Sequence, residues 1–458
     1  MTLLELKDSS FIEGKGVSKD YSQQCAAFMD AVDHLKKQYE DGQLEIVHLQ
    51  SYNPRINVET PIWYEIKSYG TSYNKTVVSN CEFFSSHYIG RYSNGVCSIV
   101  IEPRFGHVFN YLVSYATNLY LPHGFSDQSY ANKNAYWLIA LLWKAMLNKA
   151  LTTGQIPKEY QTITKNQKSF RGRLSVAKHI HVNLCDASRF YCSYKKLSMD
   201  NTINRTIRTI YGILKNKGLS SIVSEFEAYD NYLCSMGVGS EMSDVREIDN
   251  IRYTKLNIPY MPVMELSRTI LSNHQAESSN GDSIKHNVSY FIDIAELWEM
   301  YLLKLLQNNL SPEYHVYSPN ADYGNNLLNS GMREIRPDII IEKNNRVLMI
   351  IDAKYKNYTQ FGRNSMEGVK REDLYQMSTY LYHYGKDNEE IVGLFTSPVT
   401  PAYSGKEVYS YSHNSHHRIG LANLDITAND ENLEIIHANE RKYIEQIKEL
   451  LSVPKIRN

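Results

Sequence analysis

Two aspartates and a lysine stand at the ends of two neighbouring apolar runs in the last third of the chain. Asp338 comes directly before the run 339–341, and Asp352 directly after the run 347–351, with Lys354 two residues further on. A short polar segment separates the runs, so the sequence predicts a hairpin of two buried strands. Antiparallel pairing then brings both carboxylates to one end, and Lys354 shares a strand face with Asp352.

The two predicted carboxylates would repel each other unless a divalent cation lay between them. Together with the backbone carbonyl of Ala353, Asp338 and Asp352 would hold Mg²⁺ through oxygen ligands, and Mn²⁺ is an alternative ion. Such an ion lowers the pKa of bound water and neutralises charge on a phosphate under attack. Lys354 would orient the water or stabilise developing charge. These residues therefore predict metal-dependent phosphodiester hydrolysis.

Each half of this pattern also has an ordinary structural interpretation. Asp-x-Lys is commonly a surface ion pair, and a Pro-Asp step such as Pro337-Asp338 is a common opening of a strand. Because both occur at matching ends of one continuously apolar hairpin, which is typical of a covered α/β sheet, the joint pattern favours the metal site.

A predicted helix upstream of the hairpin adds a third acid. Over residues 291–306, helical spacing puts Glu299 on the apolar stripe, whereas Glu296 falls on the polar side with Asp293 and Lys304. A buried carboxylate needs a cation or a hydrogen-bonding partner. We therefore expect Glu299 to be a further metal ligand, with pairing to a buried lysine or tyrosine as the alternative.

A second predicted helix, over residues 371–385, follows the hairpin. Its Gln376 and Tyr380 lie at i and i+4, side by side on one face. A glutamine beside a tyrosine is commonly solvated. Near the two carboxylates, however, Gln376 becomes the candidate residue that orients substrate or water.

The length, net charge and motif content of the chain limit how it could bind a nucleic acid. Its 458 residues suggest two or three domains. With 49 Lys and Arg against 50 Asp and Glu, the net charge is -1, so the positive excess typical of autonomous DNA binding is missing. The chain also has no Gly-x-x-x-x-Gly-Lys-Ser/Thr loop for nucleotide phosphates. DNA binding must be local or supplied by a partner.

Changes in pattern along the chain predict an α+β multidomain protein. We expect a β-rich N-terminal domain over 1–160 with a docking role, a basic and helical middle region over 161–272, and an α/β domain over 285–458. The boundary before the last domain is a polar linker, 272–287. The basic stretch 165–178 contains five Lys and Arg residues and no acid, so it either contacts DNA phosphates or an acidic partner, or is a solvated face.

Cysteine usage and the absence of targeting segments indicate the cytoplasm. None of the six cysteines forms a Cys-x-x-Cys pair, and their spacing gives no disulfide framework. The N-terminus lacks the basic start and apolar core of a signal peptide. No apolar stretch approaches the roughly 20 residues that span a bilayer, so no membrane partner is expected.

Several blocks of the sequence resemble the PD-(D/E)xK nuclease superfamily and, more closely, the McrC family, the nuclease subunit of McrBC-type restriction systems. The blocks are LWEMYL (297–302), RPDIII (336–341), IIDAKYK (350–356) and DLYQMSTY (373–380), supported upstream by GVCSIVIEPRFG (95–106), FRGRLSVAKHI (170–180) and LSMDNTINRTIRTI (197–210). The resemblance covers roughly residue 80 to the end and leaves residues 1–75 without a counterpart. Trp298 stands where the family commonly has Phe, and Arg104 where it commonly has Lys.

The resemblance implies a fold, an activity and a partner. It implies a restriction-endonuclease-like C-terminal domain in which Asp338, Asp352, Lys354, Glu299 and Gln376 form the site. It also implies a hexameric McrB-like AAA+ GTPase that reads and translocates the DNA. Two alternatives stay open: an autonomous restriction or repair nuclease, and a non-cutting subunit that stimulates a partner GTPase. Methylated cytosine and a particular unmethylated sequence both stay open as the target.

Overall fold

The computed structural model forms two compact units, Met1–Ala135 with Asp282–Asn458, and Tyr136–Gly281. The residues that the structure describes are 2–7, 11–15, 19–41, 46–47, 49, 60–72, 75–94, 96–106, 108–117, 136–239, 245–279, 289–319, 325–326, 334–355, 369–385, 390–398, 407–410, 417–426 and 433–452.

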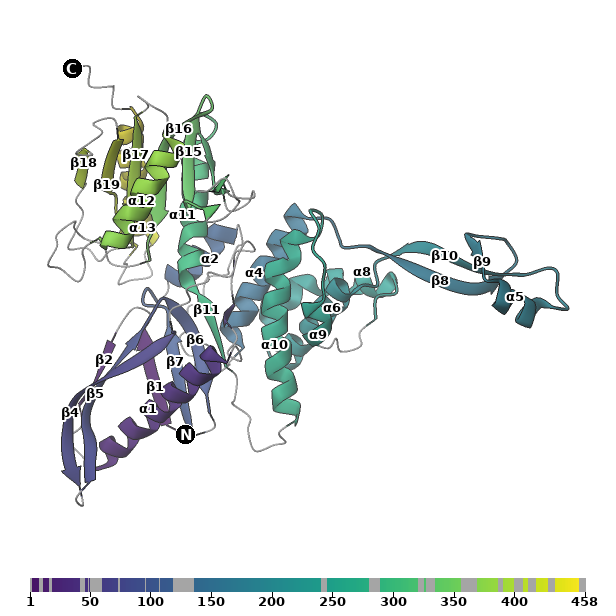
Figure 1. Cartoon of the computed structure of the whole chain (residues 1–458), viewed down its shortest axis with the longest axis horizontal. Helices are drawn as coiled ribbons and strands as arrows, with labels where there is room; N and C mark the ends of the chain where they lie inside the picture. Colours follow the sequence, from purple (N-terminus) through teal and green to yellow (C-terminus); the bar gives the residue numbers. More distant parts are fainter. Residues whose placement is uncertain are drawn as a thin grey trace. The chain divides into compact units, whose positions relative to one another are not determined.

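A five-stranded sheet in the first unit joins four strands from the N-terminal part of the chain with one strand that follows the second unit (Figure 1). Its order is β1-β7-β6-β11-β3, and the strands are β1 (Thr2–Lys7), β3 (Ile46–Val47), β6 (Tyr88–Ser93), β7 (Cys97–Glu102) and β11 (Tyr290–Asp293). β11 pairs antiparallel with β6 and parallel with β3. The strand that leads into the C-terminal part is therefore built into the N-terminal sheet.

A second, three-stranded sheet packs beside helix α1 (Lys19–Glu40). Its order is β2-β5-β4, with strands β2 (Phe11–Lys15), β4 (Ile62–Ser72) and β5 (Lys75–Ser85). Leu35 of α1 and Phe83 of β5 belong to one apolar core with strands of the first sheet. Helix α2 (Val108–Thr117) follows β7 and packs against a helix of the C-terminal part.

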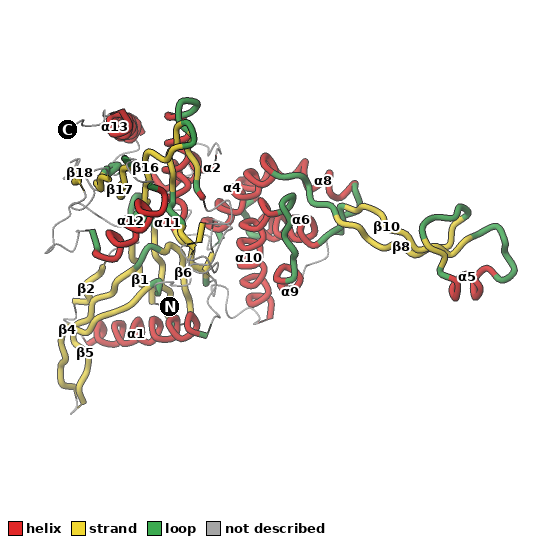
Figure 2. Tube along the Cα trace, turned by 45° about the horizontal axis from the view of Figure 1, so that its top comes forward, coloured by secondary structure: helices red, strands yellow, loops and turns green. Residues whose placement is uncertain are grey.

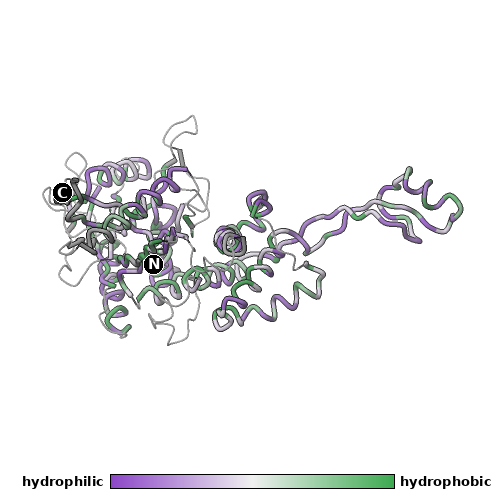
Figure 3. The backbone as a smooth tube through the Cα atoms, turned by 90° about the horizontal axis from the view of Figure 1, so that it is seen from below, coloured by the Kyte–Doolittle hydropathy of each residue, from purple (hydrophilic) through white to green (hydrophobic). Residues whose placement is uncertain are grey.

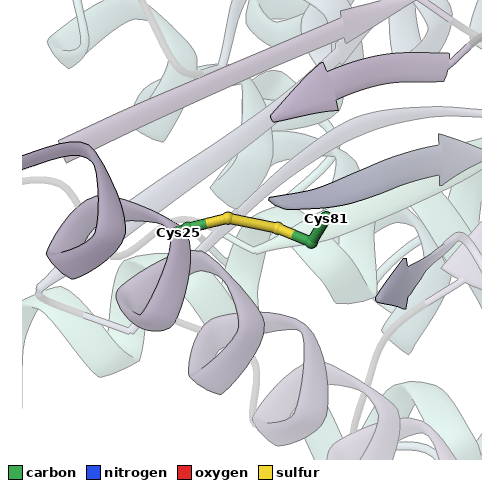
Figure 4. The surroundings of a disulfide bond; sticks show 2 residues. All are labelled: Cys25 and Cys81. Atoms are coloured by element: carbon green, nitrogen blue, oxygen red, sulfur yellow. A yellow bond between two sulfur atoms is a disulfide. The ribbon is translucent and has the colours of Figure 1, made fainter. Parts of the chain in front are cut away.

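Cys25 of α1 and Cys81 of β5 form a disulfide inside this core (Figure 4). The expectation of no disulfide is therefore wrong at this pair. The two cysteines are 56 residues apart, and they meet only because α1 packs on β5, a contact that cysteine spacing does not reveal.

The C-terminal part of the first unit is a six-stranded mixed sheet. Its order is β12-β15-β16-β17-β19-β18, with strands β12 (His315–Tyr317), β15 (Ile339–Lys343), β16 (Arg346–Ala353), β17 (Ile391–Thr396), β18 (Glu407–Ser410) and β19 (His417–Leu421). The helices are α11 (Ile294–Leu310), α12 (Arg371–Tyr384) and α13 (Leu433–Ser452), and β13 (Asn325–Asn326) pairs with β14 (Glu334–Ile335). Both α11 and α12 pack against β16.

The hairpin predicted from the apolar runs is confirmed as β15 and β16. Its turn residues Asn344 and Asn345 have φ values of 54° and 61°, a left-handed conformation that asparagine tolerates better than most residues. Ile339, Ile340, Met349, Ile350 and Ile351 are all fully buried. The continuous apolar runs therefore correspond to strands covered on both faces, as predicted.

The second unit is helical and carries a long arm (Figure 2). Its helices are α4 (Trp137–Thr153), α6 (Thr202–Asn216), α7 (Ser220–Val223), α8 (Glu227–Ser235), α9 (Val245–Asp249) and α10 (Met261–Ser279), with single 3-10 turns Ser224–Phe226 and Ile258–Tyr260. The arm is the sheet β8-β10-β9, made of β8 (Glu159–Gln167), β9 (Arg173–Leu174) and β10 (Phe190–Ser198), with helix α5 (Val176–Asn183) at its end.

The predicted linker at the end of this unit is partly wrong. Upstream of it, the side chain of Asn201 caps α6 by accepting the N–H of Asn204. The predicted linker 272–287 is helical as far as Ser279. Helix α10 continues there because a polar sequence without Pro or Gly is compatible with a solvated helix. Residues 280–288 lie outside the described residues.

The fold is mixed α/β with several sheets and helices, as the expectation of an α+β multidomain protein requires. The domain boundaries 1–160, 161–272 and 285–458 stay a prediction. In the described part of the chain, every helix is too short or too polar to cross a membrane.

Candidate active site

The register of the β15–β16 hairpin brings Asp338 and Asp352 to the same end of the sheet. Ile339 pairs with Ile351, so the next positions along each strand are the two aspartates. A carboxylate oxygen of Asp338 accepts the backbone N–H of Ala353 at 2.8 Å. Asp338 is thereby fixed to the residue that separates Asp352 from Lys354.

The ammonium of Lys354 lies among three oxygen acceptors. It is 3.0 Å from Oδ2 of Asp352, 3.2 Å from Oδ1 of Asp373 and 3.3 Å from Oε1 of Gln376. The Lys354 side chain is 18% exposed, so it reaches solvent although most of it is covered. The structure thus brings Asp338, Asp352, Lys354 and Gln376 together.

Asp373 is a site residue that the sequence reasoning did not single out. It lies in the first turn of α12, three residues before Gln376, and therefore on the same side of the helix. That spacing from Gln376 is the sequence feature by which it could have been found. Its carboxylate gives the ammonium of Lys354 a second negative partner besides Asp352.

Tyr380 connects Gln376 to the segment that leads through Asp338 into β15. Nε2 of Gln376 donates to the Tyr380 hydroxyl at 2.7 Å, and this hydroxyl donates to the carbonyl oxygen of Arg336 at 2.8 Å. The predicted i, i+4 neighbours are therefore hydrogen-bonded to each other. The chain of bonds holds the Gln376 amide in one orientation, with its oxygen toward Lys354.

Burial and charge together shift the titration of this site. Asp352 is 3% exposed. Burial, and then the negative charge of Asp338, raise the pKa of Asp352 to about 8 against the opposing effect of Lys354. Burial alone would lower the pKa of Lys354, but the charges of Asp352, Asp338 and Asp373 raise it. A buried carboxylate next to a second carboxylate is an environment that a bound cation would stabilise.

The donor set at the hairpin end fits a hard divalent cation. Two carboxylates and the carbonyl of Ala353 supply oxygen ligands only, which is the chemistry that Mg²⁺ and Mn²⁺ prefer. Within the described ranges, no three His, Cys, Asp or Glu side chains are grouped so as to hold a metal ion. The protein would therefore provide a partial set of ligands, with water and phosphate completing the shell, as Mg²⁺ commonly requires.

Glu299 is buried on α11, as the apolar stripe predicted, at 6% exposure. Its neighbour Trp298 donates its indole N–H to the carbonyl oxygen of Thr396 at 3.3 Å. The same carbonyl accepts the backbone N–H of Lys354 at 2.9 Å. The Thr396 carbonyl thus connects this turn of α11 to the backbone of Lys354. Among the described residues, however, Glu299 does not form a three-acid group with Asp338 and Asp352.

The prediction that Glu296 and Asp293 lie on a polar side of α11 is wrong. They are 4% and 1% exposed. Glu296 accepts the backbone N–H of Leu49, and Asp293 caps the helix by accepting the N–H of Ala295 at 2.9 Å. Helical spacing gave the wrong answer because segments from the N-terminal part cover this face of α11.

Comparison with known proteins identifies one family and several similar solved structures. The model of a family described as "McrBC 5-methylcytosine restriction system component" matches residues 86–394. No curated protein matches the chain. The chain is similar to part of a tetradecameric assembly of Thermococcus gammatolerans McrB AAA+ hexamers with bound McrC, at 16% identity and a TM-score of 0.48, covering 97% of this chain and 100% of that one. It is also similar to a chain of the Thermococcus gammatolerans McrBC complex, at 17% identity and a TM-score of 0.35, covering 68% and 88%.

Proposed function

Because this chain belongs to the family of McrBC 5-methylcytosine restriction system components, we propose that it is the nuclease subunit of such a system. It hydrolyses phosphodiester bonds of DNA in a Mg²⁺-dependent reaction, on a PD-(D/E)xK arrangement of β15, β16 and their flanking helices. The observation that carries the proposal is the hairpin end, where Asp338 is bonded to Ala353 and Lys354 lies 3.0 Å from Asp352.

The residues at the hairpin end divide the work of hydrolysis. Asp338, Asp352 and the Ala353 carbonyl would hold the cation. Glu299 is not grouped with the two aspartates in the described structure, so it would supply a further oxygen ligand only if its turn of α11 moved closer to them. The bound cation supplies a water of lowered pKa and positive charge for the attacked phosphate. Lys354 donates hydrogen bonds to the attacking water and to the charge that develops on the phosphate oxygens.

Gln376 and Asp373 orient the groups that react. The Gln376 amide, fixed by Tyr380, accepts from Lys354 at 3.3 Å and positions its ammonium beside the substrate. Asp373 lies 3.2 Å from the ammonium of Lys354, and its negative charge helps to keep the lysine protonated.

A partner GTPase would supply the nucleotide binding and the DNA recognition that this sequence does not provide. The sequence has neither a phosphate-binding loop nor a positive excess, so DNA recognition and nucleotide-driven movement fall to a McrB-like AAA+ subunit. Family membership supports this assignment. A cytoplasmic location follows from the proposed system and stays part of the proposal.

The arm of the second unit is the candidate surface for that partner. Ile180 and Leu184, at and just after α5, are 55% and 79% exposed, and Phe170 is 57% exposed. Asn183 exchanges side-chain hydrogen bonds with Asn166 at 2.7 and 2.9 Å, so α5 is fixed on the ribbon despite this exposure. Hydrophobic positions continue along the end of the arm (Figure 3), and exposed apolar side chains on an ordered element are typical of interfaces.

Basic side chains surround these apolar positions. They are Lys165, Lys168, Arg171, Arg173 and Lys178, all exposed. An acidic and apolar surface on the GTPase would complement the arm, which favours the partner-contact interpretation of the stretch 165–178 over a solvated face.

Cleavage of plasmid DNA with Mg²⁺, with and without the neighbouring GTPase and GTP, tests the proposal. Plasmids with and without 5-methylcytosine are compared, because the family description makes methylated DNA the first substrate to examine. Cutting that needs the partner and disappears in Asp352→Ala supports the proposal. Cutting without the partner favours the autonomous nuclease, and GTPase stimulation without cutting favours the interaction subunit.

A further inference from the structure

The turn between β7 and α2 carries an arginine to the end of β16. Its backbone is closed by hydrogen bonds from the N–H of Gly106 to the carbonyl of Pro103 and from the N–H of Val108 to the carbonyl of Phe105, both at 3.1 Å. Gly106 has a φ of +51°, which glycine adopts without steric cost. Arg104 therefore extends from a fixed turn, although it precedes Lys354 by 250 residues in the sequence.

The guanidinium of Arg104 lies against two aromatic rings. Its central carbon is 4.4 Å from the ring centroid of Tyr355 and 4.7 Å from that of Phe105. One guanidinium N–H also donates to the backbone carbonyl of Tyr355 at 3.5 Å. Because Tyr355 is only 3% exposed, this cation–π contact is largely desolvated and correspondingly stronger than one at the surface.

Tyr355 directly follows Lys354, so the two sides of Lys354 are held by different elements. On the N-terminal side, Ala353 pairs with Thr396 of β17, and Lys354 donates its backbone N–H to the same residue. On the C-terminal side, Arg104 holds both the ring and the carbonyl of Tyr355. The backbone of Lys354 is thus fixed between β17 and the turn of the N-terminal part.

We propose that Arg104 is a positioning residue for Lys354. The ammonium of Lys354 reaches Asp352, Asp373 and Gln376 at once. Because the side chain is flexible, with four rotatable bonds, a fixed backbone at Lys354 limits how far the ammonium can move away from these three partners. Release of Tyr355 lets the backbone of Lys354 move, and a misplacement of about 1 Å can cost about 100-fold in rate. The catalytic consequence rests on the proposed nuclease function, whereas the positioning does not.

Helix α2, which follows the turn of Arg104, packs against α11, the helix that carries Glu299. Tyr111 of α2 and Tyr301 of α11 both donate to one oxygen of the buried carboxylate of Glu440, at 2.5 and 2.6 Å. Tyr301 lies two residues after Glu299. The turn therefore contacts the end of β16 at Tyr355, and α2 is linked to α11 through Glu440 of α13. Both contacts are consistent with a positioning role for this segment.

Chemical labelling of Lys354 tests the positioning without reference to cleavage. The full-length protein is treated with an amine-reactive ester, and the modification rate of each lysine is measured by peptide mass spectrometry. We expect Arg104→Ala to raise the rate at Lys354 by about 10-fold, and Arg104→Lys to stay within about threefold of wild type because it keeps the cation. Lys343, at the other end of the hairpin, serves as the internal reference, and Arg441→Ala on the exposed face of α13 is the matched control.

Two results would overturn the proposal. One is an unchanged rate at Lys354 in Arg104→Ala, and the other is an equal rise at Lys343, which would indicate general loosening of the fold. A double-mutant cycle adds a second criterion: Arg104→Ala and Tyr355→Leu should have effects on the labelling of Lys354 that do not add, since each removes the same contact. Additive effects would mean that Arg104 does not act through Tyr355.

A cleavage assay of the same variants with the partner GTPase separates this inference from the proposed function. If wild type cuts and Asp352→Ala does not, Arg104→Ala should cut about 10- to 100-fold more slowly at unchanged DNA affinity, with partial rescue in Arg104→Lys. Wild-type cutting rates in Arg104→Ala would overturn the inference alone. Failure of wild type to cut, with Lys354 still released in Arg104→Ala, would overturn the proposed function alone.

Discussion

The carboxylate of Asp338 accepts a hydrogen bond of 2.8 Å from the backbone N–H of Ala353. Ala353 lies between Asp352 and Lys354 in the sequence. This hydrogen bond therefore holds Asp338, just before β15, next to Asp352 and Lys354, at the end of β16. This bond engages one carboxylate oxygen of Asp338 in the fold, and the negative charge of the group is what would attract a cation. The side chain therefore has a structural and a chemical part that different substitutions can separate.

Asp338→Asn should abolish cleavage while leaving the fold intact. Its amide oxygen can still accept the N–H of Ala353, but the negative charge is lost. We expect DNA cleavage to fall by about 100-fold or more, the equivalent of about 3 kcal/mol of transition-state stabilisation, with an unchanged melting temperature. Asp338→Ala also removes the acceptor and should lower the free energy of unfolding by about 1–3 kcal/mol. Full activity in Asp338→Asn would contradict the metal-ligand role.

The stability of the metal-free protein should fall as pH rises from about 4 to 8. Burial and Asp338 raise the pKa of Asp352 from 3.8 to about 8, so the folded chain keeps this proton over a range in which the unfolded chain has lost it. The contribution is fully present below the unfolded pKa and is lost as pH rises through the folded pKa.

Asp352→Asn should remove that pH dependence. Denaturant unfolding with a chelator at pH 5 and pH 8 should give a larger drop for wild type than for Asp352→Asn, by about 2–5 kcal/mol. At pH 8, Mg²⁺ should restore the stability of wild type and have no such effect on the variant. Equal pH dependence in both proteins would mean that Asp352 is not the titrating group.

How far the sequence predicted this site depends on whether the relevant contacts are local. The β15–β16 hairpin was predictable because its apolar runs, its polar turn and its two terminal acids lie within about twenty residues. The pairing of Gln376 with Tyr380 was predictable because it is one turn of one helix. Asp373 obeys the same rule and was missed only because its spacing from Gln376 was not considered.

Contacts across long sequence separations were not predictable from one sequence. Glu296 and Asp293 were assigned to a solvated face because helical spacing cannot reveal the cover that Leu49 and His87 provide. The disulfide between Cys25 and Cys81 depends on the packing of α1 on β5 in the same way. The contact of Arg104 with Tyr355 joins positions 251 residues apart, so it too is visible only in the fold.

Asp373→Asn should slow cleavage without weakening Mg²⁺ binding. Its carboxylate is 3.2 Å from the ammonium of Lys354, so its negative charge helps to hold the lysine and to keep it protonated. We expect the cleavage rate to fall about 3- to 10-fold, with Mg²⁺ affinity unchanged in calorimetry. Glu372→Gln is the matched control, because it removes a charge from the same helix turn at an exposed position. A loss of Mg²⁺ affinity in Asp373→Asn would instead make Asp373 a metal ligand.

Polar substitutions at the end of the arm should weaken the complex with the GTPase and spare the nuclease site. Ile180 and Leu184 are 55% and 79% exposed, so Ile180→Ser with Leu184→Ser removes little buried area from the free chain. If a partner covers both side chains, the dissociation constant should rise about 10- to 100-fold, since two aliphatic contacts are lost from an interface. Leu256→Ser is the matched control, because Leu256 is 64% exposed in the same unit but lies outside the arm. Binding by calorimetry that is equal in the double variant and in the control would exclude the arm as the docking surface, and the partner would then have to bind elsewhere on the chain.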